Sequence, residues 1–206
     1  MDVKKFTQKK AALGIFNDVV PNGIANQIEP NCRIMGLTRG QFSLIDLVYS
    51  VLKKIGPSDV YIVTWSAGIK DVNNVKWMMD SSLIKKVRLI TDHSYKTRQK
   101  KYAQSVEQLF GVENILTSEI HAKFVLICND DYKISIRTSM NLNANKTCES
   151  FELDEGDEIF DFYYSFISHL EANQVKGFVQ DSQVANKTLD LFFFKTEKSI
   201  KGWSEL

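Results

Sequence analysis

The sequence contains little of what marks linkers, disulfide frameworks or membrane segments. Proline occurs only three times in 206 residues, so no proline-rich linker divides the chain. The cysteines are odd in number and form no Cys-x-x-Cys pair, which indicates neither a zinc site nor a disulfide framework: Cys32, Cys128 and Cys148. No apolar run approaches the roughly 20 residues that cross a bilayer, and the first ten residues lack the apolar core of a secretory signal. We therefore expect a cytoplasmic protein with no membrane contact.

An excess of one charge is also absent. Lysine and arginine number 26, aspartate and glutamate number 25, and the net charge is +1, so total charge favours no polyanionic partner. A hydrophobic fraction of 44% and a charged fraction of 25% are ordinary for a globular domain with a sizeable core. The length fits one α/β domain with a small appendage.

Hydrophobic periodicity predicts alternating helices and strands from Gly36 onward. Residues 43–55 have helical spacing, with Ser43 as the N-cap and a Gly-Pro pair as the stop. Further helices are predicted over residues 73–83, 95–110 and 157–170, and strands over 59–65, 86–91, 121–128, 133–139 and 150–153. This order predicts an α/β sandwich with a central mixed β-sheet flanked by helices.

The expected domain organisation follows from where this patterning starts and stops. We expect an N-terminal arm or peripheral strand over residues 1–35, the main domain over 36–172 and a C-terminal appendage over 173–206. The appendage is polar except for the apolar run 189–194, which is either a core strand or an interface segment.

The most informative side chains follow one another along three predicted strands. His121 and Lys123 are two residues apart on the first, so their side chains leave the same face. Ser139 and Asn141 repeat that spacing at the end of the next strand, and Glu149 opens the third. A tight Asn-Asp-Asp-Tyr turn would pair the first two strands antiparallel, so all five polar groups can converge at one end of the sheet.

This mixture of side chains suits phosphoryl transfer. A neutral imidazole is a nucleophile near neutral pH, which gives His121 the role of attacking phosphorus. The ammonium of Lys123 and the neutral donors of Ser139 and Asn141 can surround the oxygens of the transition state. Glu149 can accept a hydrogen bond from the second ring nitrogen of a histidine, which would fix the tautomer and stabilise the imidazolium.

The segments HAK and TSMNLNANKTCE resemble the phospholipase D superfamily pattern, in which H-x-K is followed by G-S-x-N and a later glutamate. The matching positions are His121, Lys123, Ser139, Asn141 and Glu149. The resemblance implies a phospholipase D-like fold, a covalent phosphohistidine on His121, and chemistry that needs no metal or other cofactor. It further implies that Lys123 and Asn141 hold the phosphate and that Glu149 supports the histidine.

Two positions depart from that pattern, and the chain contains only one copy of it. Cys128 stands where the family has an aspartate, and Thr138 stands where a glycine precedes the serine. Because the family's aspartate is mainly structural, both an active enzyme and a degenerate, inactive member stay open. Members with one motif pair as homodimers, so the resemblance also implies a two-fold axis that brings His121 of two copies together. One imidazole would attack phosphorus and the other would protonate the leaving oxygen.

Further substrate-binding candidates lie outside the motif. Trp65 and Ser66 end a predicted strand and can line the pocket, because bases stack on aromatic rings; core packing is the alternative for the tryptophan. Lys96 and Arg98 belong to a stretch with seven basic residues and one acid, which is either a phosphate-binding patch or a solvated helix face. His93 follows another predicted strand, where a capping role competes with a functional one.

Three functions compete at this point. The first is a metal-independent phosphodiesterase, a hydrolase of the nuclease kind that acts on DNA or RNA as a homodimer. The second is a catalytically inactive nucleic-acid-binding module of the same fold, motivated by Cys128 and Thr138. The third, hydrolysis of phospholipids or other small phosphodiesters, ranks lowest because the sequence shows no basic amphipathic membrane helix.

Overall fold

The computed structural model describes residues 9–15, 21–143, 146–174, 176–178, 189–190 and 192. The strands are β1 (Lys10–Ile15), β2 (Cys32–Thr38), β3 (Ser58–Thr64), β4 (Ile84–Asp92), β5 (Ile115–Ser118), β6 (Phe124–Cys128), β7 (Lys133–Thr138) and β8 (Glu149–Glu155). The helices are α1 (Asn22–Ala25), α2 (Leu44–Ile55), α3 (Ile69–Asp80), α4 (Tyr95–Arg98), α5 (Lys100–Phe110) and α6 (Asp157–Asn173). None of these helices is long and apolar enough to cross a membrane.

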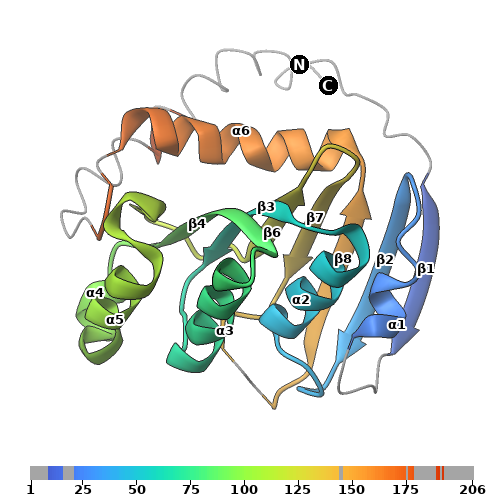
Figure 1. Ribbon diagram of the computed structural model, residues 1–206, viewed down its shortest axis with the longest axis horizontal. Helices are drawn as coiled ribbons and strands as arrows, with labels where there is room; N and C mark the ends of the chain where they lie inside the picture. Colours follow the sequence, from blue (N-terminus) through green and yellow to red (C-terminus); the bar gives the residue numbers. More distant parts are fainter. Residues whose placement is uncertain are drawn as a thin grey trace, which may run out of the picture.

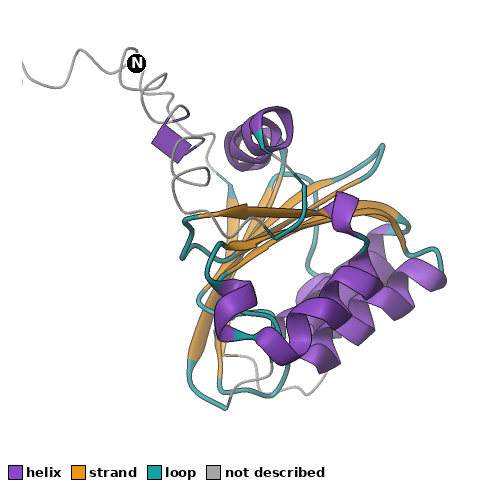
Figure 2. Ribbon diagram, turned by 90° about the vertical axis from the view of Figure 1, so that its left-hand side faces the viewer, coloured by secondary structure: helices purple, strands orange, loops and turns teal. Residues whose placement is uncertain are grey.

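The strands form one mixed sheet in the order β1-β2-β8-β7-β6-β3-β4-β5. Strands β3, β4 and β5 are parallel to one another, whereas each pair along the series β3-β6-β7-β8-β2 is antiparallel. Helix α6 covers one face of the sheet, and α2, α3 and α5 cover the other (Figures 1 and 2). The predicted sandwich with a mixed sheet flanked by helices is confirmed.

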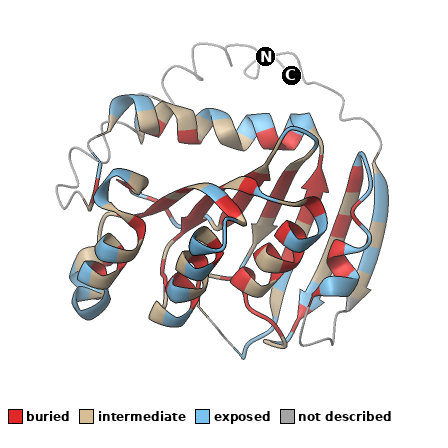
Figure 3. Cartoon of the chain, in the orientation of Figure 1, coloured by how far each residue is buried: buried red, intermediate tan, exposed pale blue. Residues whose placement is uncertain are grey.

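Each face of the sheet buries its own apolar core (Figure 3). The larger core lies against α2, α3 and α5 and includes Leu47, Val51 and Val75. The smaller core lies under α6 and includes Tyr61 and Phe124. Because a one-residue slip moves every side chain of a strand to the opposite face, it would exchange the side chains that the two cores receive from a central strand, so the strand ends are fixed in register.

Helix α2 forms as its sequence predicts. The Ser43 hydroxyl accepts a hydrogen bond from the Asp46 N–H at 3.3 Å, and the Asp46 carboxylate accepts one from the Ser43 N–H at 2.8 Å, which completes a capping box. Gly56 ends the helix at φ +88°, a backbone conformation that glycine adopts without strain.

Two strands lie where none was predicted. Strand β2 crosses the expected boundary between residues 35 and 36 and pairs with β8, so part of the expected N-terminal arm belongs to the central sheet. Gly36 interrupts its alternation, and a pairing with a strand so distant in sequence leaves no local signal. Strand β5 has four residues, too few for periodicity to show.

Most predicted elements differ from the structure by one to four residues at their ends; the helix predicted over 73–83, for example, is Ile69–Asp80. Two differences bear on the site. The helix predicted over 95–110 breaks at Gln99, whose φ of −120° and ψ of 42° are not helical, and becomes α4 and α5. The strand predicted over 121–128 begins only at Phe124, the first residue that pairs with β3 and β7. The three residues before it form a loop.

Parts of the expected C-terminal appendage pack on the domain. Phe178 stacks on Tyr95, with ring centroids 5.3 Å apart. Phe192, within the apolar run 189–194, lies against Phe166 of α6, with ring centroids 5.5 Å apart. Residues 189, 190 and 192 of that run are helical, so the predicted core strand is wrong at those positions. The alternative of an interface segment stays a prediction.

Candidate active site

The motif residues lie along one edge of the sheet. Because β6 is antiparallel to β3, the start of β6 lies beside the end of β3, with Phe124 paired to Val63. The end of β7 reaches the same edge, where the Thr138 N–H donates to the Lys123 carbonyl at 3.1 Å. Thr138 in turn pairs with Phe151 near the start of β8. Side chains that follow or precede these three strands therefore gather at one end of the sheet.

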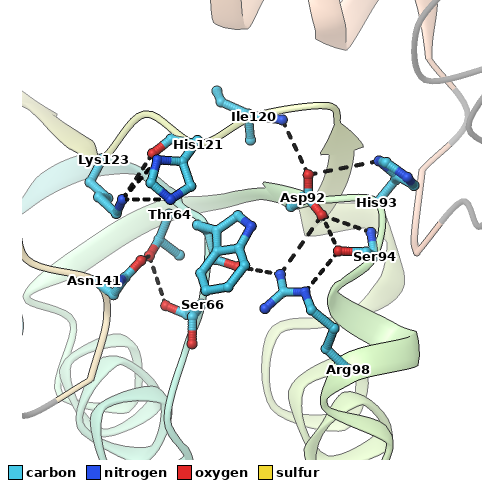
Figure 4. A network of polar contacts seen from close by, with 11 residues as sticks. Thr64, Ser66, Asp92, His93, Ser94, Arg98, Ile120, His121, Lys123 and Asn141 are labelled. Carbon is cyan, nitrogen blue, oxygen red and sulfur yellow. Dashed lines mark hydrogen bonds and ion pairs between the residues drawn. The ribbon is translucent and has the colours of Figure 1, made fainter.

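His121 and Lys123 contact each other, although neither lies on a strand. The prediction that they share a strand face is wrong, because β6 begins after them. The loop itself brings them together: Lys123 Nζ lies 3.4 Å from both ring nitrogens of His121 and donates to its carbonyl oxygen at 3.0 Å (Figure 4). The imidazole is exposed to solvent, so a substrate can reach it.

Partial burial changes the acidity of this lysine. Desolvation lowers the pKa of Lys123 below its ordinary value, and the nearby carboxylate of Glu149 partly offsets that effect. A poorly hydrated ammonium binds an anion more strongly than a fully hydrated one. The influence of Glu149 also shows that the carboxylate lies within electrostatic reach of Lys123.

Trp65 contacts both His121 and Arg98. The ring centroids of Trp65 and His121 are 5.5 Å apart, at an interplanar angle of 58°. The Arg98 guanidinium lies over the indole, 3.7 Å from its centroid, and donates to the Trp65 carbonyl oxygen at 2.8 Å. The cation–π contact and the hydrogen bond together fix the two side chains beside the imidazole.

Ser139 and Glu149 are bonded to each other across the ends of β7 and β8. The Ser139 hydroxyl donates to the Glu149 carboxylate and accepts from the Ser150 N–H at 3.0 Å. Glu149 also accepts a hydrogen bond from the Thr147 hydroxyl at 3.1 Å. These contacts place a hydroxyl and a carboxylate beside the end of β7, where the Thr138 N–H bonds to the Lys123 carbonyl.

Asn141 is held against the end of β3. Its Oδ1 lies 3.5 Å from the hydroxyl of Thr64, a fully buried residue whose hydroxyl also donates to the Ser66 carbonyl at 2.7 Å. The Leu142 N–H donates to that hydroxyl oxygen and to the Ser66 carbonyl, both at 3.1 Å. Because the amide oxygen faces Thr64, the amide nitrogen is the group that Asn141 can offer to a phosphate. Ser66 itself is buried and takes part through its backbone.

The structure does not bring Lys96 into this cluster. Lys96 Nζ lies 3.3 Å from the Glu107 carboxylate on α5. The predicted basic stretch is spread over β4, α4 and α5, and Arg88 is paired with Glu171 of α6 at 2.7 Å. Arg98 is the member of that stretch that touches Trp65.

The structure accommodates the two departures from the motif without backbone strain or an added charge. Cys128 is the last residue of β6, at the opposite end of that strand from His121, and packs against the core under α6. Burial raises the pKa of its thiol, with a smaller effect from Asp59, so no carboxylate-like charge replaces the family's aspartate. The φ of Thr138 is not positive, so that position does not require glycine.

The motif does not include Asp92, yet this residue belongs to the same edge. It ends β4, is 7% exposed, and accepts hydrogen bonds from the Ser94 N–H at 3.0 Å and the Ile120 N–H at 3.4 Å. Its Oδ1 also lies 3.7 Å from Arg98 Nη2. The signal that could have found it is the Asp-x-Ser sequence at a strand end, which is typical of a turn fixed by the aspartate side chain.

A hollow of about 880 Å³ opens beside Ser139 on the α6 side of the sheet. Its walls include the apolar Leu13 and Leu37 of β1 and β2 and the ion pair of Arg137 with Glu152, 2.8 Å apart. Because the cation in the wall is already paired, the hollow suits an uncharged group better than a second phosphate.

Comparisons with known proteins bear on the fold. No family model and no curated protein matches the chain. Among solved structures, the chain is similar to polyphosphate kinase from Porphyromonas gingivalis, with a TM-score of 0.52 and 14% identity, over 69% of this chain. The chain spans only 26% of that kinase, whose fold is phospholipase D-like. The fold that the motif implies is therefore confirmed, and at this identity the likeness shows the fold alone.

Proposed function

We propose that this protein is a metal-independent phosphodiesterase of the nuclease kind that works through a phosphohistidine on His121. The observation that carries the proposal is the contact of His121 with Lys123 at an edge where Asn141, Ser139 and Glu149 also gather. The fold shared with a polyphosphate kinase supports chemistry at phosphorus.

The side chains divide the reaction into two steps. A ring nitrogen of His121 attacks phosphorus while the bond from phosphorus to the leaving oxygen breaks. Lys123 and the Asn141 amide bind the non-bridging oxygens, whose interactions strengthen in the transition state. The leaving oxygen takes a proton from His121 of a second copy, since one imidazole cannot be both nucleophile and acid. Water, deprotonated by that second imidazole, then attacks phosphorus, breaks the phosphorus–nitrogen bond and frees the first histidine.

A nucleic acid is the substrate that the neighbouring groups favour. The Trp65 ring offers a surface on which a base can stack, and Arg98 lies over the same ring. The apolar hollow beside Ser139 can take the uncharged part of a nucleotide that flanks the reacting phosphate.

The test is cleavage of DNA, RNA and bis(p-nitrophenyl) phosphate in excess EDTA. Among the described residues, no three His, Cys, Asp or Glu side chains are arranged to hold a metal ion. We expect wild-type protein to cleave in EDTA and His121→Ala to be inactive. Wild-type protein quenched in alkali during turnover of bis(p-nitrophenyl) phosphate should carry a p-nitrophenyl phosphoryl group on His121 by mass spectrometry. His169→Ala, on α6, is the matched control and should keep the wild-type rate. Activity in a clean His121→Ala preparation contradicts the mechanism.

The alternative is a catalytically inactive nucleic-acid-binding module of the same fold. Cys128 and Thr138, which depart from the family pattern, favour it. It predicts binding that weakens steeply with salt and no turnover of any phosphodiester. A trapped phosphohistidine excludes it.

A further inference from the structure

We propose that Asp92 is a positioning residue that orients His121 through two separate connections, one to the loop backbone at Ile120 and one to the imidazole ring through Arg98 and Trp65. This inference rests on the proposed function of His121 as the nucleophile. Figure 4 shows the arrangement, with Asp92 and its donors on one side of the site and His121 with Lys123 on the other.

The first connection runs to the loop backbone. Asp92 Oδ2 accepts a hydrogen bond from the N–H of Ile120, the residue immediately before His121, at 3.4 Å. Ile120 is buried, with 9% of its surface exposed, so this end of the loop is anchored both by packing and by the carboxylate. A loop that is fixed at the preceding residue limits the positions that the imidazole can reach.

The second connection runs to the ring through Arg98 and Trp65. Asp92 Oδ1 lies 3.7 Å from Arg98 Nη2, and the Ser94 hydroxyl, which donates to the same Oδ1, accepts from Arg98 Nε at 2.8 Å. Arg98 in turn stacks on Trp65, whose ring packs against His121. The exposed guanidinium is therefore held in one orientation, and it holds the indole against the imidazole.

A carboxylate is the group that this position requires. Each oxygen serves one connection: Oδ1 faces Ser94 and Arg98, and Oδ2 faces the Ile120 N–H. The Ser94 N–H and hydroxyl and the Ile120 N–H all donate to this carboxylate, and the Arg98 cation lies beside it. An asparagine would turn its NH₂ group toward one of these donors and would break one connection while keeping the size of the side chain.

The kinetic effect of losing this support should fall on the chemical step. A displacement of a reacting group by about 1 Å can cost about 10²-fold in rate. We expect Asp92→Asn to lower kcat by about 10²-fold and to leave KM nearly unchanged, because Asp92 contacts the Ile120 N–H, Ser94 and Arg98 rather than the phosphate. Asp80→Asn, which breaks an exposed ion pair with Lys76 on α3, is the matched control and should keep wild-type values.

A second readout does not depend on activity. In a Trp77→Phe, Trp203→Phe background, Trp65 is the remaining tryptophan, and protonation of a neighbouring imidazole quenches indole emission. We expect an emission change with pH that His121→Ala abolishes and that Asp92→Asn strongly reduces. An inactive wild type that still shows this Asp92-dependent change would refute the proposed function and keep the positioning role.

Wild-type kcat together with an unchanged emission titration in Asp92→Asn would overturn the inference. Where that variant does not fold, Arg98→Met replaces it, because Arg98 is exposed and its loss cuts the second connection alone. This variant should lower kcat by about tenfold and weaken the Trp65 response. Unchanged values for both measurements would equally overturn the inference.

Discussion

The two halves of the sheet contribute different groups to the candidate site. The antiparallel half, β6, β7 and β8, supplies the residues that can meet a phosphate: His121, Lys123, Ser139 and Glu149. The parallel half, β3, β4 and β5, supplies the groups around them, with Asp92 at the end of β4. The site lies where the halves meet, because β3 pairs with β4 on one side and with β6 on the other.

The two contributions also differ in exposure. His121 and Ser139 are exposed, whereas Thr64 and Asp92, at the ends of the parallel strands, are buried. Exposed side chains can exchange water for substrate, and buried hydrogen-bonded side chains hold one geometry. Under the proposed function, the antiparallel half would carry the chemistry and the parallel half would fix its geometry, so substitutions in the two halves should have different kinetic effects.

The largest effect is expected from Lys123→Met in the antiparallel half. Methionine keeps the length and the apolar stem but removes the charge next to the imidazole. Loss of one group that stabilises transition-state charge typically costs about 10²–10³ in kcat, which a single-turnover assay with bis(p-nitrophenyl) phosphate would measure. Lys76→Met on α3 is the control. A loss smaller than about tenfold would mean that Lys123 does not touch the reacting phosphate.

The difference between the halves also explains what the sequence could predict. His121, Lys123, Ser139 and Asn141 are recognisable because their spacings are short and local. Helix α2 is predictable for the same reason, since its capping box lies within four residues. The order of side chains along each segment is therefore enough to single out the candidate residues of the antiparallel half.

The parallel half depends on contacts between distant segments. Asp92 meets Ile120 and Arg98 meets Trp65 only because β3 and β4 are neighbours in the sheet and α4 breaks away at Gln99. No residue spacing in the sequence predicts such contacts between distant segments. The same limit explains why strand β2, which pairs with a strand far along the chain, left no local pattern.

A smaller effect is expected from Glu149→Gln. The Glu149 carboxylate raises the pKa of Lys123 against the lowering caused by burial, so its removal should lower that pKa further. Activity that needs the ammonium is present below the pKa and is lost as pH rises through it. The alkaline limb of the kcat profile should therefore move to lower pH, so the variant should lose activity at a pH where the wild type keeps it. An alkaline limb at the wild-type pH would show that Glu149 does not act on Lys123.

Lys123→Arg should move the same limb the other way. A guanidinium stays protonated to a pKa above about 12, whereas burial places the Lys123 ammonium below its ordinary value of 10.5. We expect activity near neutral pH to fall by less than about tenfold and the alkaline loss to disappear below about pH 11. A limb that persists unchanged in this variant belongs to another group, and Lys123 is then not the residue that titrates.

The smallest effect is expected from Lys96→Ala. This variant tests whether α4 contributes any residue besides Arg98 to the site. Lys96 and Arg98 are two residues apart in α4, yet Lys96 pairs with Glu107 on α5 while Arg98 covers Trp65. An exposed ion pair contributes about 0–1 kcal/mol to stability, so the variant should fold normally and keep wild-type kcat and KM. Arg98→Met, measured in parallel with the same substrate, should differ from it clearly. If Lys96→Ala instead lowered kcat as strongly as Arg98→Met, α4 would act as one basic surface, and a separate role for Arg98 beside Trp65 would no longer be needed.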